Sequence, residues 1–225
     1  MGSKKIFSLY NQLWNKGLLK TPLNIMIGGN IGTGKSTFAH LLTEHLRHIN
    51  VLPTGIIRSV LQSLNLQDRA PELYGYSYQL GQLVDEPSLS ESEKAVIGFE
   101  RQLAVVDRAV RKILEFSRTE GQQYILDGNH VVARTIVDLQ DKFNLVGVFF
   151  QTSNVEQYRK NISGPTHQRQ LTPEEFEIVR TVHGHIISEA VKYGFPVFEY
   201  NEQDKALQYV ASQVAIIIER SNGLP

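Results

Sequence analysis

The sequence predicts an α/β fold of three layers, in which a five-stranded parallel sheet lies between helices on both faces. Two observations indicate this fold. Short apolar runs of strand length alternate along the chain with longer segments whose apolar residues recur at helical spacing. The runs are apolar nearly throughout, which is typical of strands buried on both faces of a sheet. No internal repeat or linker-like stretch interrupts the alternation, so we expect one main domain.

The chain opens with a predicted amphipathic helix within residues 1–20, and residues 21–225 are expected to form the domain on which this helix docks. Apolar residues at helical spacing support the helix, namely Ile6, Leu9, Tyr10, Leu13 and Trp14. Residues 23–28 then form a short apolar run that ends in glycines, as a buried strand does, and helix-periodic residues follow from 36 to 47.

The remaining elements continue the same order. A strand is expected at 51–54, a helix at 56–64, irregular structure at 67–89 and a long helix at 92–119. Later strands are expected at 124–126, 145–150 and 195–200, and later helices near 154–161, from Pro173 onward and at 205–219. Pro173 suits a first helical turn, and acidic Glu174 and Glu175 follow it there.

A glycine-rich segment directly after the first strand matches G-x-x-x-x-G-K-[ST] at every fixed position. In this motif backbone N–H groups curl around phosphate oxygens, and the following helix adds its positive end. Lys35 is expected to reach the β- and γ-phosphates of ATP, and the Ser36 hydroxyl to bind Mg²⁺. The residues expected to contact the nucleotide are Gly29, Asn30, Ile31, Gly32, Thr33, Gly34, Lys35, Ser36 and Thr37.

An acidic residue, Asp127, ends the apolar strand at 124–126. In a parallel sheet it falls at the same edge as the glycine-rich segment, where it is expected to hold Mg²⁺ with Ser36 or to orient an attacking hydroxyl. The alternative is that Asp127 caps the turn that follows. His130 has two interpretations of equal weight, because it either binds an anionic substrate when protonated or forms hydrogen bonds within its loop.

Cationic residues are expected around the site, since phosphoryl transfer depends on neutralising charge. Arg58 follows the second strand, and Arg159 and Arg169 flank a polar loop that is predicted to be a small lid at about 159–172. Arg159 and Arg169 are expected to act in catalysis, and Arg58 with His130 to contact the acceptor. The alternative for each arginine is a solvated surface group. His183 and His185 are two residues apart on a helix, so they make a poor metal-binding pair.

With these residues in view, the chain resembles the 2-phosphoglycerate kinase family of P-loop kinases. The resemblance covers roughly residues 23–218 and rests on IGGNIGTGKST, on TGIIRSVL at 54–61, on EGQQYILDGNH at 120–130, on Arg159 and on the segment from Arg180 through Ala190 to Pro196. It implies a kinase that uses ATP and Mg²⁺ on a small phosphorylated metabolite. The implied acceptor is 2-phosphoglycerate, which would become 2,3-bisphosphoglycerate, or an inositol phosphate.

The sequence also departs from the family pattern. Gly55 stands where the family usually has aspartate after the second strand, Asp127-Gly128 replaces the usual Glu-Gly, and Ala133 replaces a proline. The missing acid at position 55 favours an alternative, a nucleotide-binding regulator with impaired catalysis. Another alternative is a polynucleotide or nucleotide-sugar kinase, because the same core serves those acceptors.

Composition narrows the functional classes. Lys and Arg number 23, as do Asp and Glu, and this balance argues against a strongly electrostatic nucleic-acid or membrane binder. The chain has no cysteine, which excludes disulfides and zinc–thiolate sites. No long apolar run resembles a signal peptide or a membrane span, so we expect a cytoplasmic protein. The oligomeric state stays open.

Overall fold

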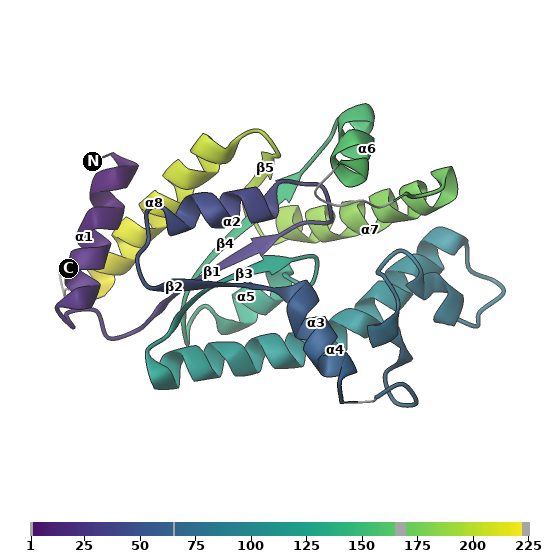
Figure 1. The fold of residues 1–225 in the computed structure, drawn as a ribbon, viewed down its shortest axis with the longest axis horizontal. Coiled ribbons are helices and arrows are strands. Elements are labelled where there is room, and N and C mark those ends of the chain that lie inside the picture. Colours follow the sequence, from purple (N-terminus) through teal and green to yellow (C-terminus); the bar gives the residue numbers. More distant parts are fainter. Residues whose placement is uncertain (1, 65, 165–169, 222–225) are drawn as a thin grey trace.

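A computed structural model describes residues 2–64, 66–164 and 170–221, and it has the three layers that the sequence predicts (Figure 1). The central sheet has the order β2-β3-β1-β4-β5, and every neighbouring pair is parallel. The strands are β1 (Leu23–Gly28), β2 (Ile49–Pro53), β3 (Gln123–Gly128), β4 (Asn144–Gln151) and β5 (Val197–Glu199). The predicted five-stranded parallel sheet is therefore confirmed.

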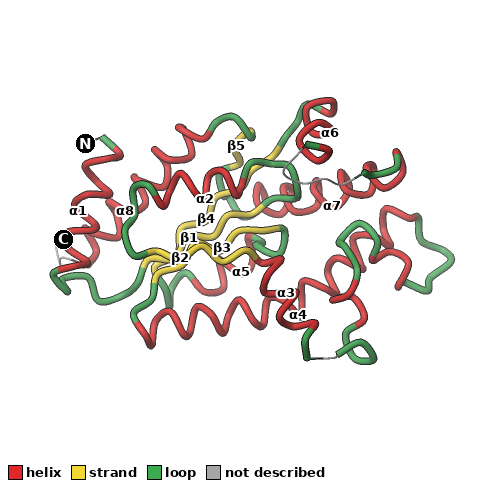
Figure 2. The backbone as a smooth tube through the Cα atoms, in the orientation of Figure 1, coloured by secondary structure: helices red, strands yellow, loops and turns green. Residues whose placement is uncertain are grey.

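Helices surround the strands, which form the centre of the molecule in Figure 2. They are α1 (Ser3–Asn15), α2 (Lys35–Thr43), α3 (Thr54–Gln62), α4 (Glu91–Glu120), α5 (Ala133–Leu139), α6 (Val155–Ser163), α7 (Pro173–Lys192) and α8 (Gln203–Ser221). Two short 3₁₀ helices, η1 (Pro71–Tyr74) and η2 (Leu80–Leu83), lie in the stretch expected to be irregular. Of the described helices, none is both long enough and apolar enough to cross a membrane.

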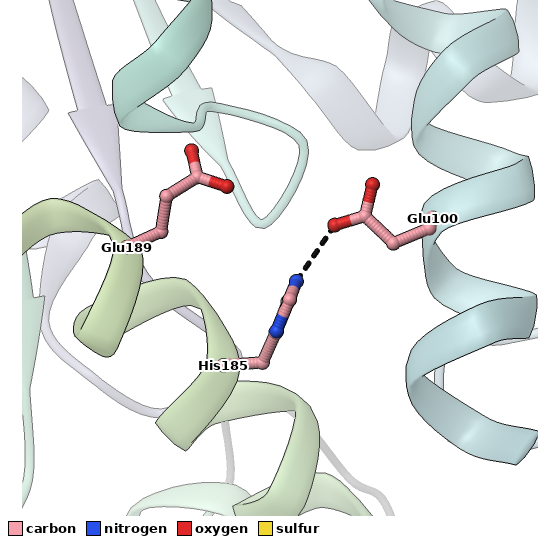
Figure 3. Close-up of side chains that lie close together, drawn as sticks. All are labelled: Glu100, His185 and Glu189. Atoms are coloured by element: carbon pink, nitrogen blue, oxygen red, sulfur yellow. Dashed lines mark hydrogen bonds and ion pairs between the residues drawn. The ribbon is translucent and has the colours of Figure 1, made fainter. Parts of the chain in front are cut away.

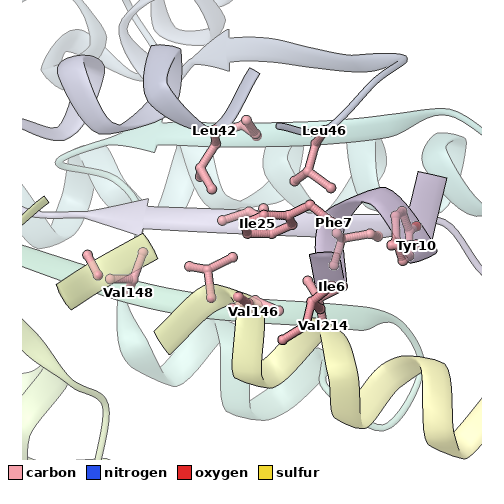
Figure 4. Close-up of a cluster of buried hydrophobic side chains, with 14 of the residues drawn as sticks. Ile6, Phe7, Tyr10, Ile25, Leu42, Leu46, Val146, Val148 and Val214 are labelled. Atoms are coloured by element: carbon pink, nitrogen blue, oxygen red, sulfur yellow. The ribbon is translucent and has the colours of Figure 1, made fainter. Parts of the chain in front are cut away.

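One face of the sheet is covered by α1, α2 and α8. Figure 4 shows apolar side chains from these helices packed against strand residues, including Phe7, Leu42 and Val214 against Ile25 and Val146. The N-terminal helix lies along α8. Its Tyr10 hydroxyl also donates a 2.7 Å hydrogen bond to Gln123 Oε1 at the start of β3. The apolar residues that predict this helix therefore lie in the core or pack against it.

The opposite face is covered by α4, α5 and α7, whose buried residues form a second apolar cluster with Met26 and Leu126 of the sheet. Helix α4 begins with a capping box, in which Ser90 and Glu93 each accept a hydrogen bond from the other's backbone N–H. It ends at Gly121, which has the left-handed backbone that a side chain disfavours. These two signals explain why a 30-residue helix begins and ends where it does.

The carboxyl ends of three neighbouring strands meet at one edge of the sheet. Asp127 of β3 lies in register with Ile27 of β1 on one side and with Pro53 of β2 on the other. The segments that follow these strands begin at residues 29, 54 and 129, so the glycine-rich segment, the start of α3 and the β3–α5 loop are brought together. The sheet thereby places the candidate residues at a shared edge.

Candidate active site

The glycine-rich segment at 29–36 joins β1 to α2, as the motif requires. Gly34 begins α2 with φ of +84°, and a Cβ there would lie 3.0 Å from the carbonyl oxygen of Tyr200. Only glycine tolerates this backbone so close to a neighbour. The turn therefore leaves the N-terminal N–H groups of α2 pointing out of the helix, in the arrangement that binds phosphate.

Lys35 is buried at the start of α2. Its Nζ donates to the backbone carbonyl of Asn30 at 2.5 Å and lies 3.4 Å from Thr33 Oγ1, so it bridges the loop in which it sits. Burial lowers the pKa of Lys35 to about 8, while the nearby Asp127 carboxylate acts in the opposite direction. The ammonium group is thus held within the loop at the phosphate edge.

The side-chain oxygens of Ser36 and Asp127 lie together and could both bind a metal ion. The Ser36 hydroxyl donates to Asp127 Oδ2 at 2.9 Å, which joins α2 to the end of β3. The other carboxylate oxygen of Asp127, Oδ1, is buried and has no hydrogen-bond partner among the described residues. Magnesium prefers hard oxygen ligands and is typically bound by few carboxylates. The two residues therefore fit a magnesium ion, and a buried carboxylate oxygen is left to bind it.

Two cavities adjoin at this pair. The larger, of about 610 Å³, runs along α2 to His40, Leu41 and Glu44, and we call it the α2 cavity. The smaller, of about 190 Å³, is lined by the ends of β2 and β3, by the loop after β1 and by residues of α3 and α4, and we call it the Asp127 pocket. Both cavities are lined by Ile31, Lys35 and Ser36. The Lys35 ammonium group and the Ser36 hydroxyl are therefore shared by the two cavities.

Arg58 and Gly55, both on α3, line the Asp127 pocket. Arg58 Nη1 donates to the backbone carbonyls of Leu73 and Gly75 at 2.8 and 2.9 Å, and its guanidinium lies 5.7 Å from the centroid of the Tyr76 ring. The sequence placed Arg58 near the acceptor, and the structure brings it to the same pocket as Asp127. At Gly55 a Cβ would meet nothing within 4 Å, so a side chain there has room.

His130 lies beneath the Asp127 pocket and is buried. Its Nδ1 lies 3.1 Å from Thr54 Oγ1 and its Nε2 2.9 Å from Gln102 Oε1. Burial, together with the smaller effect of the Arg58 charge, lowers the pKa of His130 to about 3. The imidazole is therefore neutral, and the geometry favours the hydrogen-bonding interpretation of the two that the sequence left open.

The predicted lid is described in part. Arg159 lies exposed on α6, with its guanidinium carbon 4.1 Å from the centroid of the Phe176 ring on α7. Helix α6 also contacts the glycine-rich segment, because Asn161 Nδ2 donates to the Gly32 carbonyl at 2.8 Å. Arg169, together with the centre of the predicted lid, lies outside the described residues.

A further cluster joins α4 to α7, and Figure 3 shows Glu100, His185 and Glu189 pointing toward one another. His185 Nε2 lies 2.6 Å from Glu100 Oε1. Arg134 of α5 donates to both carboxylates, at 2.5 Å to Glu100 Oε2 and also to Glu189 Oε2. Since one guanidinium group already pairs with both carboxylates, we interpret the cluster as an ion-pair network that ties three helices together. His183 instead packs against Tyr158, so the two histidines do not form a pair.

Sequence reasoning missed several residues of the Asp127 pocket. Thr54 and Asn129 line it and lie in segments that carry the family resemblance, but they were assigned no role, whereas Gln102, Tyr76 and Ser77 line it and belong to no motif. Only Gln102 carries a local signal, because it is a polar residue within the apolar stripe of a helix, next to buried Phe99 and Leu103. The others come from segments whose proximity depends on the tertiary fold.

The sequence of this chain is similar to those of curated archaeal enzymes. It is 28% identical over 218 residues to the 2-phosphoglycerate kinase of Methanocaldococcus jannaschii, and the alignment covers 92% of this chain and 69% of that protein. It is 31% identical over 197 residues to the 2-phosphoglycerate kinase of Methanothermobacter thermautotrophicus, and the alignment covers 83% of this chain and 64% of that protein. The chain is a relative of the 2-phosphoglycerate kinases. The resemblance inferred from its motifs is thereby confirmed as a similarity of sequence over most of the chain.

The chain spans about two thirds of the length of these relatives. No protein-family model matches it. Among solved structures, a putative kinase from Chloroflexus aurantiacus aligns with a TM-score of 0.49 at 15% identity, covering 88% of this chain and 98% of that one. A shikimate kinase from Acinetobacter baumannii aligns with a TM-score of 0.48 at 15% identity, covering 92% and 97%.

Proposed function

We propose that this protein is an ATP-dependent kinase that transfers the γ-phosphoryl group to a small anionic metabolite bound in the Asp127 pocket. The observation that carries the proposal is the pair of adjoining cavities, which share Lys35 and Ser36. A kinase needs a donor and an acceptor on opposite sides of one reacting phosphorus. In this assignment the α2 cavity takes the donor and the Asp127 pocket takes the acceptor.

On the donor side, the glycine-rich segment and the start of α2 bind the phosphates of ATP through backbone N–H groups. Lys35 neutralises charge on the phosphoryl group that moves. Ser36 and Asp127 would hold Mg²⁺, which supplies additional charge neutralisation at the phosphates. Arg159 and Arg169 of the predicted lid are assigned the same charge-neutralising role.

On the acceptor side, a substrate hydroxyl oxygen bonds to the γ-phosphorus while the bond from that phosphorus to the bridging oxygen breaks, releasing ADP. The proton of the hydroxyl leaves in the same step, and Asp127 is the carboxylate that lines this pocket to receive it. Arg58 supplies a positive charge for an anionic group of the acceptor. Neutral His130, whose two ring nitrogens are bonded to Thr54 and Gln102, adds no second charge to this pocket.

The acceptor we propose is 2-phosphoglycerate, with 2,3-bisphosphoglycerate as product, and an inositol phosphate is the second candidate. The relatives named 2-phosphoglycerate kinase support the first. The pocket volume of about 190 Å³ also favours a three-carbon acid over a ring that carries several phosphates.

An assay of ADP release tests the proposal. Purified protein with Mg²⁺ATP is mixed separately with 2-phosphoglycerate and with a set of inositol phosphates, and ADP is measured by a coupled reaction. We expect 2-phosphoglycerate to stimulate ADP release above the rate with ATP alone. Bound ATP without stimulation by any of these acceptors would contradict the proposal and would favour a nucleotide-binding regulator.

A further inference from the structure

Two helices fix the backbone of the segment at 71–77, which follows α3 and forms one wall of the Asp127 pocket. Gln102 Nε2 of α4 donates to the carbonyls of Glu72 and Gly75 at 2.5 and 3.0 Å. Arg58 of α3 donates to the Gly75 carbonyl as well, at 2.9 Å. Carbonyls of a surface segment ordinarily face water, so their capture by side chains of two helices is a specific feature of this pocket.

Gln102 connects this wall to the phosphate edge. The residue is 1% exposed, and because its NH₂ group donates to the two carbonyls, its Oε1 accepts from His130 Nε2–H. His130 Nδ1 then accepts from the hydroxyl of Thr54, the first residue of α3, which lies beside Gly128. A Cβ at Gly128 would lie 1.8 Å from Thr54 Oγ1, so glycine permits this close contact. The chain of hydrogen bonds fixes every donor and acceptor from the wall to the strand ends.

We propose that Gln102 is a positioning residue for the acceptor, and that Tyr76 and Ser77, which it holds in the wall, determine acceptor specificity. The proposal rests on the proposed kinase function, since it assigns one of the two cavities to the acceptor.

Two observations assign these residues to the acceptor and not to the nucleotide. Gln102, Tyr76 and Ser77 line the Asp127 pocket, whereas the described lining of the α2 cavity includes no residue of α4 or of this segment. The Tyr76 ring also lies near two other groups, with the Arg58 guanidinium 5.7 Å from its centroid and the Tyr78 ring stacked at 5.6 Å. The wall thus places an aromatic ring beside the cation that faces the acceptor.

The first test compares two buried glutamines. Gln102→Glu keeps an acceptor for His130 but loses both N–H donors to the wall. We expect the KM for 2-phosphoglycerate to rise about tenfold or more and the KM for ATP to change less than about twofold, because a lost hydrogen bond to one ligand's site acts on that ligand alone. Gln123→Glu is the matched control. Gln123 is as buried as Gln102, but it lies at the start of β3, at the opposite end of that strand from Asp127. This variant should lower the melting temperature and leave both KM values unchanged.

Surface variants keep the test informative if Gln102→Glu folds poorly. Ser77→Ala and Tyr76→Ala alter the wall itself, and Tyr74→Ala is their control, because Tyr74 is partly exposed in the same segment but does not line the pocket. We expect the first two to change the ratio of kcat/KM between 2-phosphoglycerate and 3-phosphoglycerate, and the third to preserve it. An unchanged ratio in the first two, or equal rises in the KM for ATP and for the acceptor in Gln102→Glu, would overturn the inference.

Hydrogen exchange separates this inference from the proposed function. Wild-type protein is compared with and without 2-phosphoglycerate, and the inference predicts slower exchange in peptides that cover residues 71–78. Slower exchange without turnover would refute the kinase proposal, and would reduce the inference to the binding of 2-phosphoglycerate at this wall. Normal turnover with unchanged exchange in these peptides would overturn the inference alone, and the failure of both measurements would overturn both.

Discussion

Lowering the pH from 7 toward 4 is expected to destabilise the folded protein through His130. The pKa of this buried imidazole falls from an ordinary 6.5 to about 3 on folding, mainly because burial disfavours its charged form. Between these two values the unfolded chain binds a proton that the folded protein does not bind. Stability is therefore complete above pH 6.5 and decreases as the pH falls toward 3.

The size of the effect follows from the difference between the two pKa values. Each pH unit below 6.5 costs about 1.4 kcal/mol of unfolding free energy, so His130 accounts for about 2 kcal/mol at pH 5. His183 adds an effect of the same sign, because burial lowers its pKa to about 4. A marginally stable domain loses a large share of its stability by this route.

Urea denaturation followed by circular dichroism at pH 7 and pH 5 measures the effect. His130→Gln is the informative variant, because an amide keeps one donor and one acceptor but does not titrate. The drop in unfolding free energy between the two pH values should be about 2 kcal/mol smaller in this variant than in the wild type. Exposed His40 provides the control His40→Gln, which should retain the full drop. An equal drop in wild type and His130→Gln, or an imidazole that titrates near pH 6.5 by NMR, would refute the reasoning.

Three further predictions concern the site and its support. Asp127→Asn should lower kcat at least about 100-fold, because it removes the negative charge that pairs with Mg²⁺ and receives a proton. Gly55→Ala should stabilise the protein by about 0.5–1 kcal/mol in thermal unfolding, since a Cβ at this helical position meets nothing within 4 Å. Arg134→Met should cost about 1–3 kcal/mol, because Glu100 and Glu189 would then face each other without their shared cation.

Each of these predictions has its own check. Exposed Asp141→Asn should leave kcat unchanged, and a similar kcat in Asp127→Asn would remove that residue from the mechanism. Arg180 forms an exposed pair with Glu177, so Arg180→Met should cost less than about 1 kcal/mol. Equal losses for the two arginine variants would contradict the proposed difference between the network and a surface pair. A lower melting temperature for Gly55→Ala would show that this position is strained.

Much of the fold follows from local patterns in the sequence. The apolar run at 23–28 and the glycines after it predict β1 and the turn into α2, because hydrophobic burial and backbone freedom are properties of those residues alone. Pro173 with its two glutamates correctly marks the start of α7. The short helix α5 was not predicted, because its seven residues include Thr135 and Val137 and its cap forms no side-chain hydrogen bond. It is stabilised by burial of Ala133, Ile136 and Leu139, which is a tertiary effect.

The residues of the candidate site also fall into those that local sequence patterns predict and those that only the folded structure reveals. Lys35, Ser36 and Asp127 could be proposed from sequence because the first two follow a strand within a motif and Asp127 lies near the end of an apolar run, and parallel strands end at one edge. Gln102 could not be placed there from sequence, since its partners are 28 residues away at His130 and 30 residues away at Glu72. The neutral state of His130 also depends on burial and on Arg58, which only the folded structure reveals.

A phosphorus NMR time course tests the central claim most directly. It follows wild-type protein with Mg²⁺ATP and 2-phosphoglycerate, alongside Lys35→Ala and a control, Lys112→Ala, which changes a lysine that is 80% exposed in its side chain. We predict a new phosphoester signal that grows together with ADP in the wild type and in Lys112→Ala, and that is absent from Lys35→Ala. Wild-type protein that binds ATP but forms no new phosphoester, or a product that forms equally without Lys35, would contradict the account.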